Sequence, residues 1–299
     1  MEENKPLLEG IDPEIITHMT SRRDTLLKAT ALVGAIATAP IAFGALAGTA
    51  FGQGGNLPGK IVDVLNFAFT LENLENEFYR TALNSSGLIP SETRAVFEQI
   101  GKHEAAHVAL LASVLGSKAA PKPTFDFTAG GAFADVFSNY QTFLAVSQAF
   151  EDTGVRAYKG QAGNLQSNAK ILTVALQIHS VEARHAAEVR RIRAEERPGR
   201  GWITLDSRGT LPEATQPVYS GEANTTQAGV NIAGLAGLPN TIITEAFDEP
   251  LTKEQVLAIA GLFIAKPAGM PGKMDKMEKK DKKDKMEKKD KDKKDKPKY

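Results

Sequence analysis

The stretch GKHEAAHVALL, residues 101–111, carries two overlapping metal-binding patterns. The five residues from His103 to His107 fit H-E-x-x-H, in which two histidines hold zinc and a glutamate acts as general base. The same residues contain Glu104-x-x-His107, one half of a dinuclear carboxylate site. Because residues three apart lie on one face of a helix, Glu104 and His107 can project toward the same neighbour. Three interpretations are open: a zinc hydrolase, a dinuclear metal protein, or a helix that merely carries two histidines.

A zinc hydrolase would need a third ligand for the metal. The extended pattern H-E-x-x-H-x-x-G-x-x-H requires Gly and His where this chain has Leu110 and Ser113. A glutamate from a later helix could complete a zinc site, but a hydrolase leaves a second pair, Glu182-x-x-His185, without a role. The sequence therefore disfavours zinc hydrolysis.

Four long segments place apolar residues at helical spacing, without the two-residue alternation of strands. This spacing predicts helices over about residues 57–83, 91–116, 131–161 and 167–196. Ser91 is expected to cap the second helix. Ionisable side chains interrupt the apolar face of each helix near its middle, and burying an isolated carboxylate there costs several kcal/mol. Four such interruptions indicate that cations lie between the helices.

The interrupting side chains are glutamate and histidine, the strong metal ligands left to a chain with no cysteine. They follow the order Glu, Glu-x-x-His, Glu, Glu-x-x-His, which is the arrangement of di-iron and dimanganese carboxylate bundles. Four carboxylates balance two divalent ions, and two neutral imidazoles complete the coordination. The candidate ligands are Glu72 or Glu75, Glu104, His107, Glu151, Glu182 and His185.

The local sequences around these residues resemble the ferritin-like superfamily, in particular its exported, desiccation-related branch. The similar stretches are LNFAFTLENLENEFYR, KHEAAHVALL, FEDTGVRAYKG and VEARHAAEVR, and the similarity covers about residues 60–265. The resemblance implies an all-α, ferritin-like four-helix bundle with an irregular C-terminal extension and one further helix. It also implies a dimetal centre with bridging or chelating carboxylates at Glu104 and Glu182, and terminal ligands at His107 and His185.

The first helix offers two acids on one face. Glu72 lies seven residues before Tyr79, a spacing that resembles much of the superfamily, whereas Glu75 stands where the superfamily more often has a small residue. We expect Glu72 to be the ligand and Glu75 to be an extra or alternative one.

Several neighbouring residues are expected to have supporting roles. His103 flanks the apolar face, so packing or contact with a ligand is expected rather than metal binding, and His179 is expected at the surface or beside a ligand. Asp152 is expected either to orient a histidine or to face water. The tyrosines on the apolar faces are expected to be core aromatics, with a redox or hydrogen-bonding role at the metals as the alternative; they are Tyr79, Tyr140 and Tyr158. The arginines of the fourth helix are expected on its solvated face; they are Arg184, Arg190, Arg191 and Arg193.

Outside the bundle, the two ends of the chain differ in composition. Ser21-Arg22-Arg23 followed by an Ala/Gly-rich apolar stretch resembles a twin-arginine export signal, although Thr25 departs from the usual motif. The alternative for the apolar stretch is a retained membrane anchor. The tail is a low-complexity Lys/Asp/Glu segment that is expected to be solvated. The expected division is 1–50 export signal, 56–197 bundle, 198–268 extension wrapping the bundle, and 269–299 tail. Within the extension, Thr252 and Gln255 are predicted to form a capping box that opens a final helix.

The formal net charge of the chain is zero but unevenly distributed. Residues 271–299 carry 14 Lys against 8 acidic residues, so the rest of the chain is mildly acidic. This balance disfavours nucleic acid as a partner, while the basic tail could contact an anionic envelope surface.

The sequence therefore predicts an exported protein with two iron ions that oxidises or sequesters iron with O2 or peroxide in stress or desiccation protection, a possible ferroxidase. Three alternatives remain open. One is a dimanganese catalase-like enzyme with nearly the same ligands. Another is O2-dependent oxidation of an organic substrate, which needs an apolar pocket beside the metals. The third is a non-catalytic envelope or stress protein with a structural metal site. An oligomer is possible, although the long extension disfavours a closed ferritin-type shell.

Overall fold

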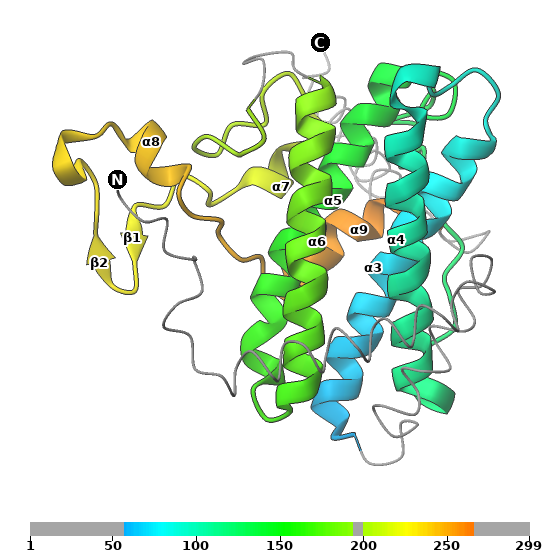
Figure 1. Ribbon diagram of the computed structural model, residues 1–299, viewed down its shortest axis with the longest axis horizontal. Helices are drawn as coiled ribbons and strands as arrows, with labels where there is room; N and C mark the ends of the chain where they lie inside the picture. The colour runs from blue at the N-terminus through cyan, green and yellow to red at the C-terminus, as the bar shows by residue number, and fades with distance from the viewer. Residues whose placement is uncertain (1–56, 194–199, 266–299) are drawn as a thin grey trace, which may run out of the picture.

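The computed structural model describes residues 57–193 and 200–265. Within these ranges, four long helices form an all-α bundle, as predicted (Figure 1): α3 (Gly59–Asn84), α4 (Ser91–Leu115), α5 (Tyr140–Ala162) and α6 (Ala169–Arg193). Helix α3 packs most extensively on α4, and α5 on α6, so the bundle consists of two helical hairpins. A long connection over residues 116–139 joins the hairpins, as one long crossover does in ferritin-like bundles.

The start of the third helix was predicted incorrectly. Helix α5 begins at Tyr140, not near residue 131, because residues 128–138 form successive turns. Gly131, at which the helix was expected to begin, has a φ of 101°, which an α-helix cannot accommodate. Phe133 and Val136 are nevertheless buried, so turn residues reproduced the apolar spacing of a helix.

The two predicted helix caps had different outcomes. Ser91 is the first helical residue and not the cap, because Pro90 occupies the cap position and no side chain caps this helix. The capping box of the last helix, α9 (Lys253–Ala260), is confirmed. The backbone N–H of Gln255 donates to Thr252 Oγ1 at 3.2 Å, and the N–H of Thr252 donates to Gln255 Oε1 at 2.8 Å.

The apolar core of the bundle is divided into two clusters. The larger one is rich in aromatic residues, with Phe78 stacked on Phe143 at a centroid distance of 5.3 Å. The smaller one lies at the end where α3 begins, drawn lowest in Figure 1, and includes Ile61, Leu115 and Ile171. Along α4 and α6, the ionisable residues fall between the two clusters. The apolar layers above and below therefore exclude water from the polar layer.

The C-terminal extension covers the bundle only in part. Helices α7 (Gln216–Tyr219) and α9 contact α5. The antiparallel strands β1 (Thr226–Gln227) and β2 (Val230–Asn231) and the short helix α8 (Asn240–Thr244) project to one side in Figure 1. The extension therefore docks through its two ends rather than along its whole length.

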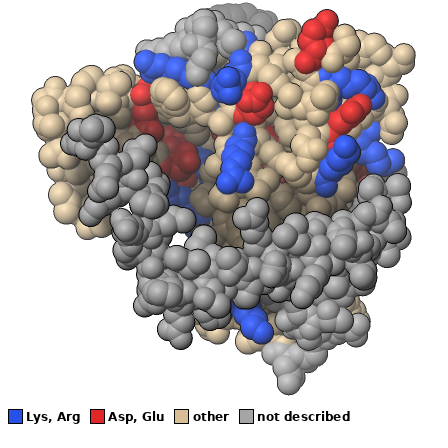
Figure 2. Space-filling model, in the orientation of Figure 1, with Lys and Arg blue, Asp and Glu red and all other residues tan. Residues whose placement is uncertain are grey.

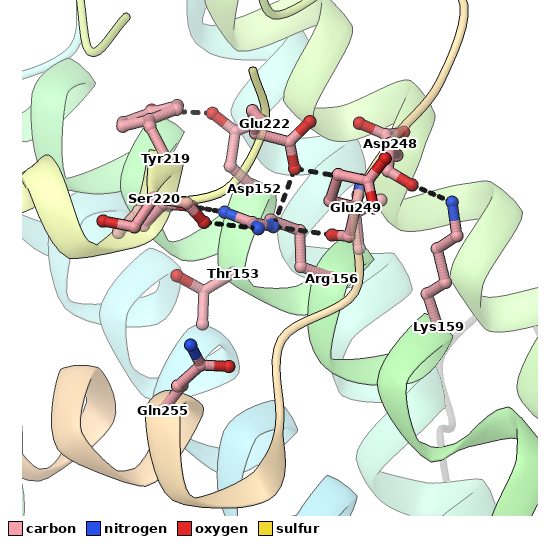
Figure 3. A network of polar contacts seen from close by, with 12 residues as sticks. Asp152, Thr153, Arg156, Lys159, Tyr219, Ser220, Glu222, Asp248, Glu249 and Gln255 are labelled. Atoms are coloured by element: carbon pink, nitrogen blue, oxygen red, sulfur yellow. Dashed lines mark hydrogen bonds and ion pairs between the residues drawn. The ribbon is translucent and has the colours of Figure 1, made fainter. Parts of the chain in front are cut away.

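Arg156 of α5 anchors the extension (Figure 3). Its side chain is 1% exposed, and Nε pairs with Glu222 Oε1 at 2.8 Å and donates to the carbonyl of Glu249 at 2.7 Å. Its other nitrogens donate to the carbonyls of Val218 and Ser220. A buried guanidinium is tolerated only when its charge and its N–H groups are satisfied, so these contacts fix the extension on α5.

The described surface shows no segregation of charge on the face drawn in Figure 2, where basic and acidic side chains are interspersed. None of the helices in 57–193 and 200–265 combines the length and the apolar character needed to cross a membrane. The predicted export signal and the Lys-rich tail lie outside the described residues.

Candidate metal centre

Glutamate and histidine side chains from all four long helices converge in the middle of the bundle. Among the described residues, two groups have one potential ligand atom per residue within 4.8 Å of each other. The first group is Glu72, Glu104, His107 and Glu182, and the second is Glu104, Glu151, Glu182 and His185. All these residues are buried, and Glu104 and Glu182 belong to both groups. The arrangement is therefore two adjacent four-residue sites that share two carboxylates.

The two helical hairpins supply equivalent sets of side chains. The first helix of each contributes one glutamate, Glu72 on α3 or Glu151 on α5. The second helix of each contributes a Glu-x-x-His pair, whose members share one helix face because they are three residues apart. The local periodicity of each helix thus aims these side chains inward, and the packing of the hairpins brings the sets together.

Each histidine presents Nδ1 to three carboxylates. His107 Nδ1 lies 3.1 Å from Glu72 Oε2, 3.1 Å from Glu182 Oε1 and 3.3 Å from Glu104 Oε2. His185 Nδ1 lies 3.0, 3.2 and 3.6 Å from oxygens of Glu104, Glu151 and Glu182. A single N–H cannot satisfy three oxygens, so the donor atoms are closer together than hydrogen bonding alone would explain.

The shared carboxylates contain buried oxygens that lack a hydrogen bond. Glu104 Oε1 and both oxygens of Glu182 have no hydrogen-bond partner among the described residues, although histidine nitrogens lie within ion-pair distance. A buried polar atom without a partner is costly. Carboxylate oxygens and imidazole nitrogens are ligands for divalent transition-metal ions, so a pair of such cations fits this donor set.

The crowding of acids displaces their proton equilibria. Burial raises the pKa of Glu72 to about 8, although His107 opposes the shift. Burial also raises the pKa of Glu151 well above its ordinary value. Burial alone would lower the pKa of His107 and His185, but the surrounding carboxylates outweigh it and raise the pKa of both imidazoles. Protons and metal ions therefore compete for the same donor atoms.

Glu75 lies outside both four-residue groups. Its carboxyl is buried, and a Cβ placed on Gly154 would lie 3.3 Å from Glu75 Oε1. Burial, followed by the negative charges of Glu182 and Glu104, raises the pKa of Glu75 well above its ordinary value. The structure thus brings Glu72 into a group with a histidine and leaves Glu75 beside the site.

Two of the buried tyrosines also form hydrogen bonds with candidate ligands, as in the alternative to a purely apolar role. The hydroxyl of Tyr158 donates to Glu72 Oε1, and that of Tyr79 donates to Glu151 Oε1. Each tyrosine therefore lies on the helix opposite the carboxylate that it contacts. A signal was present in the sequence, because Tyr158 follows Glu151 by the same seven residues that separate Glu72 and Tyr79. Tyr140 lies away from the site, and its hydroxyl is hydrogen-bonded to Thr93 Oγ1 at 2.7 Å.

His103 contacts one of the candidate ligands. Its Nδ1 lies 2.9 Å from His185 Nε2, with the two rings nearly parallel. Its Nε2 lies 2.7 Å from the side-chain nitrogen of Gln99, a residue that the sequence did not single out. His103 belongs to neither four-residue group but contacts His185, which does. This position agrees with the expectation that His103 contacts a ligand and does not bind the metal itself. His179 instead forms a hydrogen bond between its Nδ1 and the backbone carbonyl oxygen of Val155, at 3.0 Å.

Asp152 and Arg190 are placed differently from the sequence expectation. Asp152 neither faces water nor contacts a histidine, and Arg190 is not on a solvated face. Arg190 Nη2 donates to Asp152 Oδ1 at 2.6 Å, and the hydroxyl of Tyr219 donates to Asp152 Oδ2 at 2.7 Å. The pair is largely buried because α7 of the extension covers it, an interaction between distant segments that helix periodicity does not reveal.

The comparison with protein families gives one match that includes the whole site. Residues 60–195 match the family model described as a ferritin-like domain. This range contains nearly all of the four long helices and every candidate ligand. The comparison with curated proteins gave no significant match.

Proposed function

We propose that this protein, whose residues 60–195 match a ferritin-like domain, binds two iron ions and uses them to oxidise or sequester iron with O2 or peroxide. The observation that carries the proposal is the pair of four-residue groups that share Glu104 and Glu182. Glu72 with His107 would complete one ion position. Glu151 with His185 would complete the other.

The charge of the site supports two divalent ions. The four carboxylates in the two groups offer four negative charges, and the histidines can bind as neutral imidazoles. Bound iron would supply the electron-transfer chemistry. The chain would hold the carboxylates in place through Tyr79 and Tyr158, and would exclude water with the apolar layers on either side.

The cellular role extends this proposal. The twin-arginine-like N-terminus and the resemblance to the desiccation-related branch support export to the periplasm, envelope or extracellular space, with protection against oxidative stress as the benefit. Oxidation of Fe2+ at the site would consume free Fe2+ and an oxidant at the same time, and would therefore limit the oxidative damage that the two cause together. The Lys-rich tail would add contact with an anionic surface.

The decisive experiment is metal analysis of protein purified from its native host, followed by addition of Fe2+ with O2 or with peroxide. We expect two metal ions per chain and oxidant-dependent formation of Fe3+. Glu104→Ala and Glu182→Ala should each reduce the metal content, because both positions share these carboxylates. Glu188→Ala, which removes a partly exposed acid of the same helix α6, is the matched control. Unchanged stoichiometry in both site variants would refute the assignment.

The same experiment separates the alternatives. Bound manganese with rapid peroxide turnover would identify a catalase-like enzyme that uses the same residues. Metal binding without oxidation of added Fe2+ would identify a structural site in a non-catalytic stress or envelope protein.

A further inference from the structure

A small apolar cavity lies next to the candidate metal centre, at the end of the bundle where α3 begins. Its volume is about 30 Å³, and all four long helices line it. Ala68 lies on α3, Leu111 on α4, Tyr158 on α5 and Ala175 on α6. Two of these four residues are alanines, whose small side chains leave space that the larger neighbouring side chains do not fill.

The cavity is one helical turn from the carboxylate layer on three helices. Ala68 precedes Glu72 by four residues, and the cavity-lining Ile178 precedes Glu182 by four. On α4, Leu111 follows His107 by four. Since one turn of helix advances about 5.4 Å, the cavity and the candidate ligands occupy successive layers of the bundle.

One side chain connects the two layers directly. The ring of Tyr158 lines the cavity, and its hydroxyl donates to Glu72 Oε1. The side chain of Tyr158 would therefore lie between a molecule in contact with its ring and the carboxylate of Glu72.

The chemistry of the walls disfavours water as the occupant. Apart from Tyr158 and Gln161, the residues that line the cavity are aliphatic or phenylalanine. The hydroxyl hydrogen of Tyr158 is already donated to Glu72, and Gln161 Oε1 accepts from Asn164 at 2.9 Å. A buried water needs two to four polar partners, whereas apolar cavities stay dry and take apolar guests.

The size of the cavity limits the occupant further. A dry protein cavity that binds benzene has a volume of about 150 Å³, several times larger than this one. An organic substrate of ordinary size is therefore excluded from the space as it stands. A diatomic gas, which is small and needs no hydrogen bonds, fits both the volume and the walls.

We propose that this cavity binds O2 and delivers it to the carboxylate layer, so that O2 rather than hydrogen peroxide is the preferred oxidant. Hydrogen peroxide has two O–H donors that would lose their hydrogen bonds to water on entering such walls. The gas-binding part stands on the cavity alone, while the choice of oxidant rests on the proposed function.

Gas binding is tested with full-length protein under xenon pressure, with xenon detected by crystallography or by ¹²⁹Xe NMR. Wild-type protein should bind xenon between Ala68 and Ala175. Ala175→Leu and Ala68→Leu, on different helices, should each remove the xenon signal. Ala169→Leu makes the same chemical change at an exposed position of α6 and should retain it. Absence of xenon from wild-type protein, or its persistence in both filled variants, would overturn the inference.

The choice of oxidant is tested by the rate of Fe2+ oxidation with each oxidant in turn. The filled variants should need about fivefold more O2 for half-maximal rate while the rate with peroxide stays within about twofold of wild type. An equal loss with both oxidants would show a structural effect and would overturn the inference. Failure of wild-type protein to bind metal would instead overturn the proposed function, and the xenon measurement would still report on the cavity.

Discussion

Glu72 and Glu75 show how two acids on one helix face can have different environments. Glu72 lies 3.1 Å from His107 Nδ1 and accepts from Tyr158, whereas Glu75 belongs to neither four-residue group. The helix spacing of three residues places both side chains inward, so only their neighbours distinguish them.

The two acids should respond differently to the same substitution. Glu72→Gln removes a negatively charged oxygen ligand and is expected to cost one metal ion per chain. Glu75→Gln replaces a carboxyl that lies outside both four-residue groups by an amide of similar shape, so the metal content should remain that of wild type. Metal stoichiometry by elemental analysis measures the difference. Loss of metal from the Glu75 variant alone would reverse the assignment.

His103 should influence metal affinity without binding the metal. A group that orients a ligand histidine typically contributes 10- to 100-fold to metal affinity. His103→Ala removes the contact with His185 Nε2, so we expect the metal dissociation constant to rise by about 10- to 100-fold. His179→Ala removes a histidine that bonds a backbone carbonyl instead, and should leave the constant unchanged. Competition with a chelator measures both, and equal constants for the two variants would contradict this role.

At the scale of elements, helix α5 links the candidate site to the extension. One face carries Glu151 and Tyr158 toward the bundle centre, and Arg156 and Gly160 lie against the extension. The apolar periodicity of the sequence predicts the inward face. The second buried face of α5 depends on a segment about 60 to 90 residues later in the chain, so the sequence pattern could not reveal it.

Gly160 allows the extension to approach α5 closely. A Cβ at this position would overlap the carbonyl oxygen of Leu251. Gly160→Ala should therefore displace residues around Leu251 and destabilise the fold by about 1–3 kcal/mol, as overpacking does. Thermal unfolding measures the loss, and limited proteolysis should show earlier cleavage in the extension than in the bundle.

The matched control for this substitution is Gly163→Ala. No atom lies within 4 Å of a Cβ placed on Gly163, and its φ is −60°. This variant should unfold at the wild-type temperature. Equal destabilisation by both substitutions would indicate that contact with Leu251 is not the cause.

At the scale of the whole molecule, buried charge at the candidate site opposes folding unless protons or metal ions neutralise it. Burial raises the pKa of Glu72 to about 8, so below that pH the carboxyl retains a proton that a metal ion must displace. Metal affinity should therefore increase as pH rises from 6 to 8, and binding near pH 7 should release protons. Calorimetry in buffers of different ionisation enthalpy measures this release. Affinity that is independent of pH would contradict the competition.

Bound metal should also stabilise the fold, because it binds the native but not the unfolded chain. At a free metal concentration 100 times the dissociation constant, the expected gain is about 2.7 kcal/mol for each ion bound. Removal of metal with a chelator should lower the unfolding temperature of wild-type protein, and should have much less effect on Glu104→Ala. A similar decrease in both proteins would point to an effect of the chelator elsewhere.

The sequence by itself determined the all-α bundle and the order of glutamate and histidine along its helices. Both follow from a spacing of three to four residues, which is a local property of each segment. It failed over residues 131–139, where buried turn residues imitate that spacing, because apolar spacing alone does not distinguish a series of turns from a helix.

Only the tertiary structure decided which inward-facing side chains meet. The separation of Glu72 from Glu75, the tyrosines that cross between helices, the cover that α7 places over Asp152, and the cavity beside Ala175 all depend on several helices at once. The physical reason is that helix periodicity fixes the direction of a side chain from its own axis, whereas its distance to a partner depends on how separate helices pack.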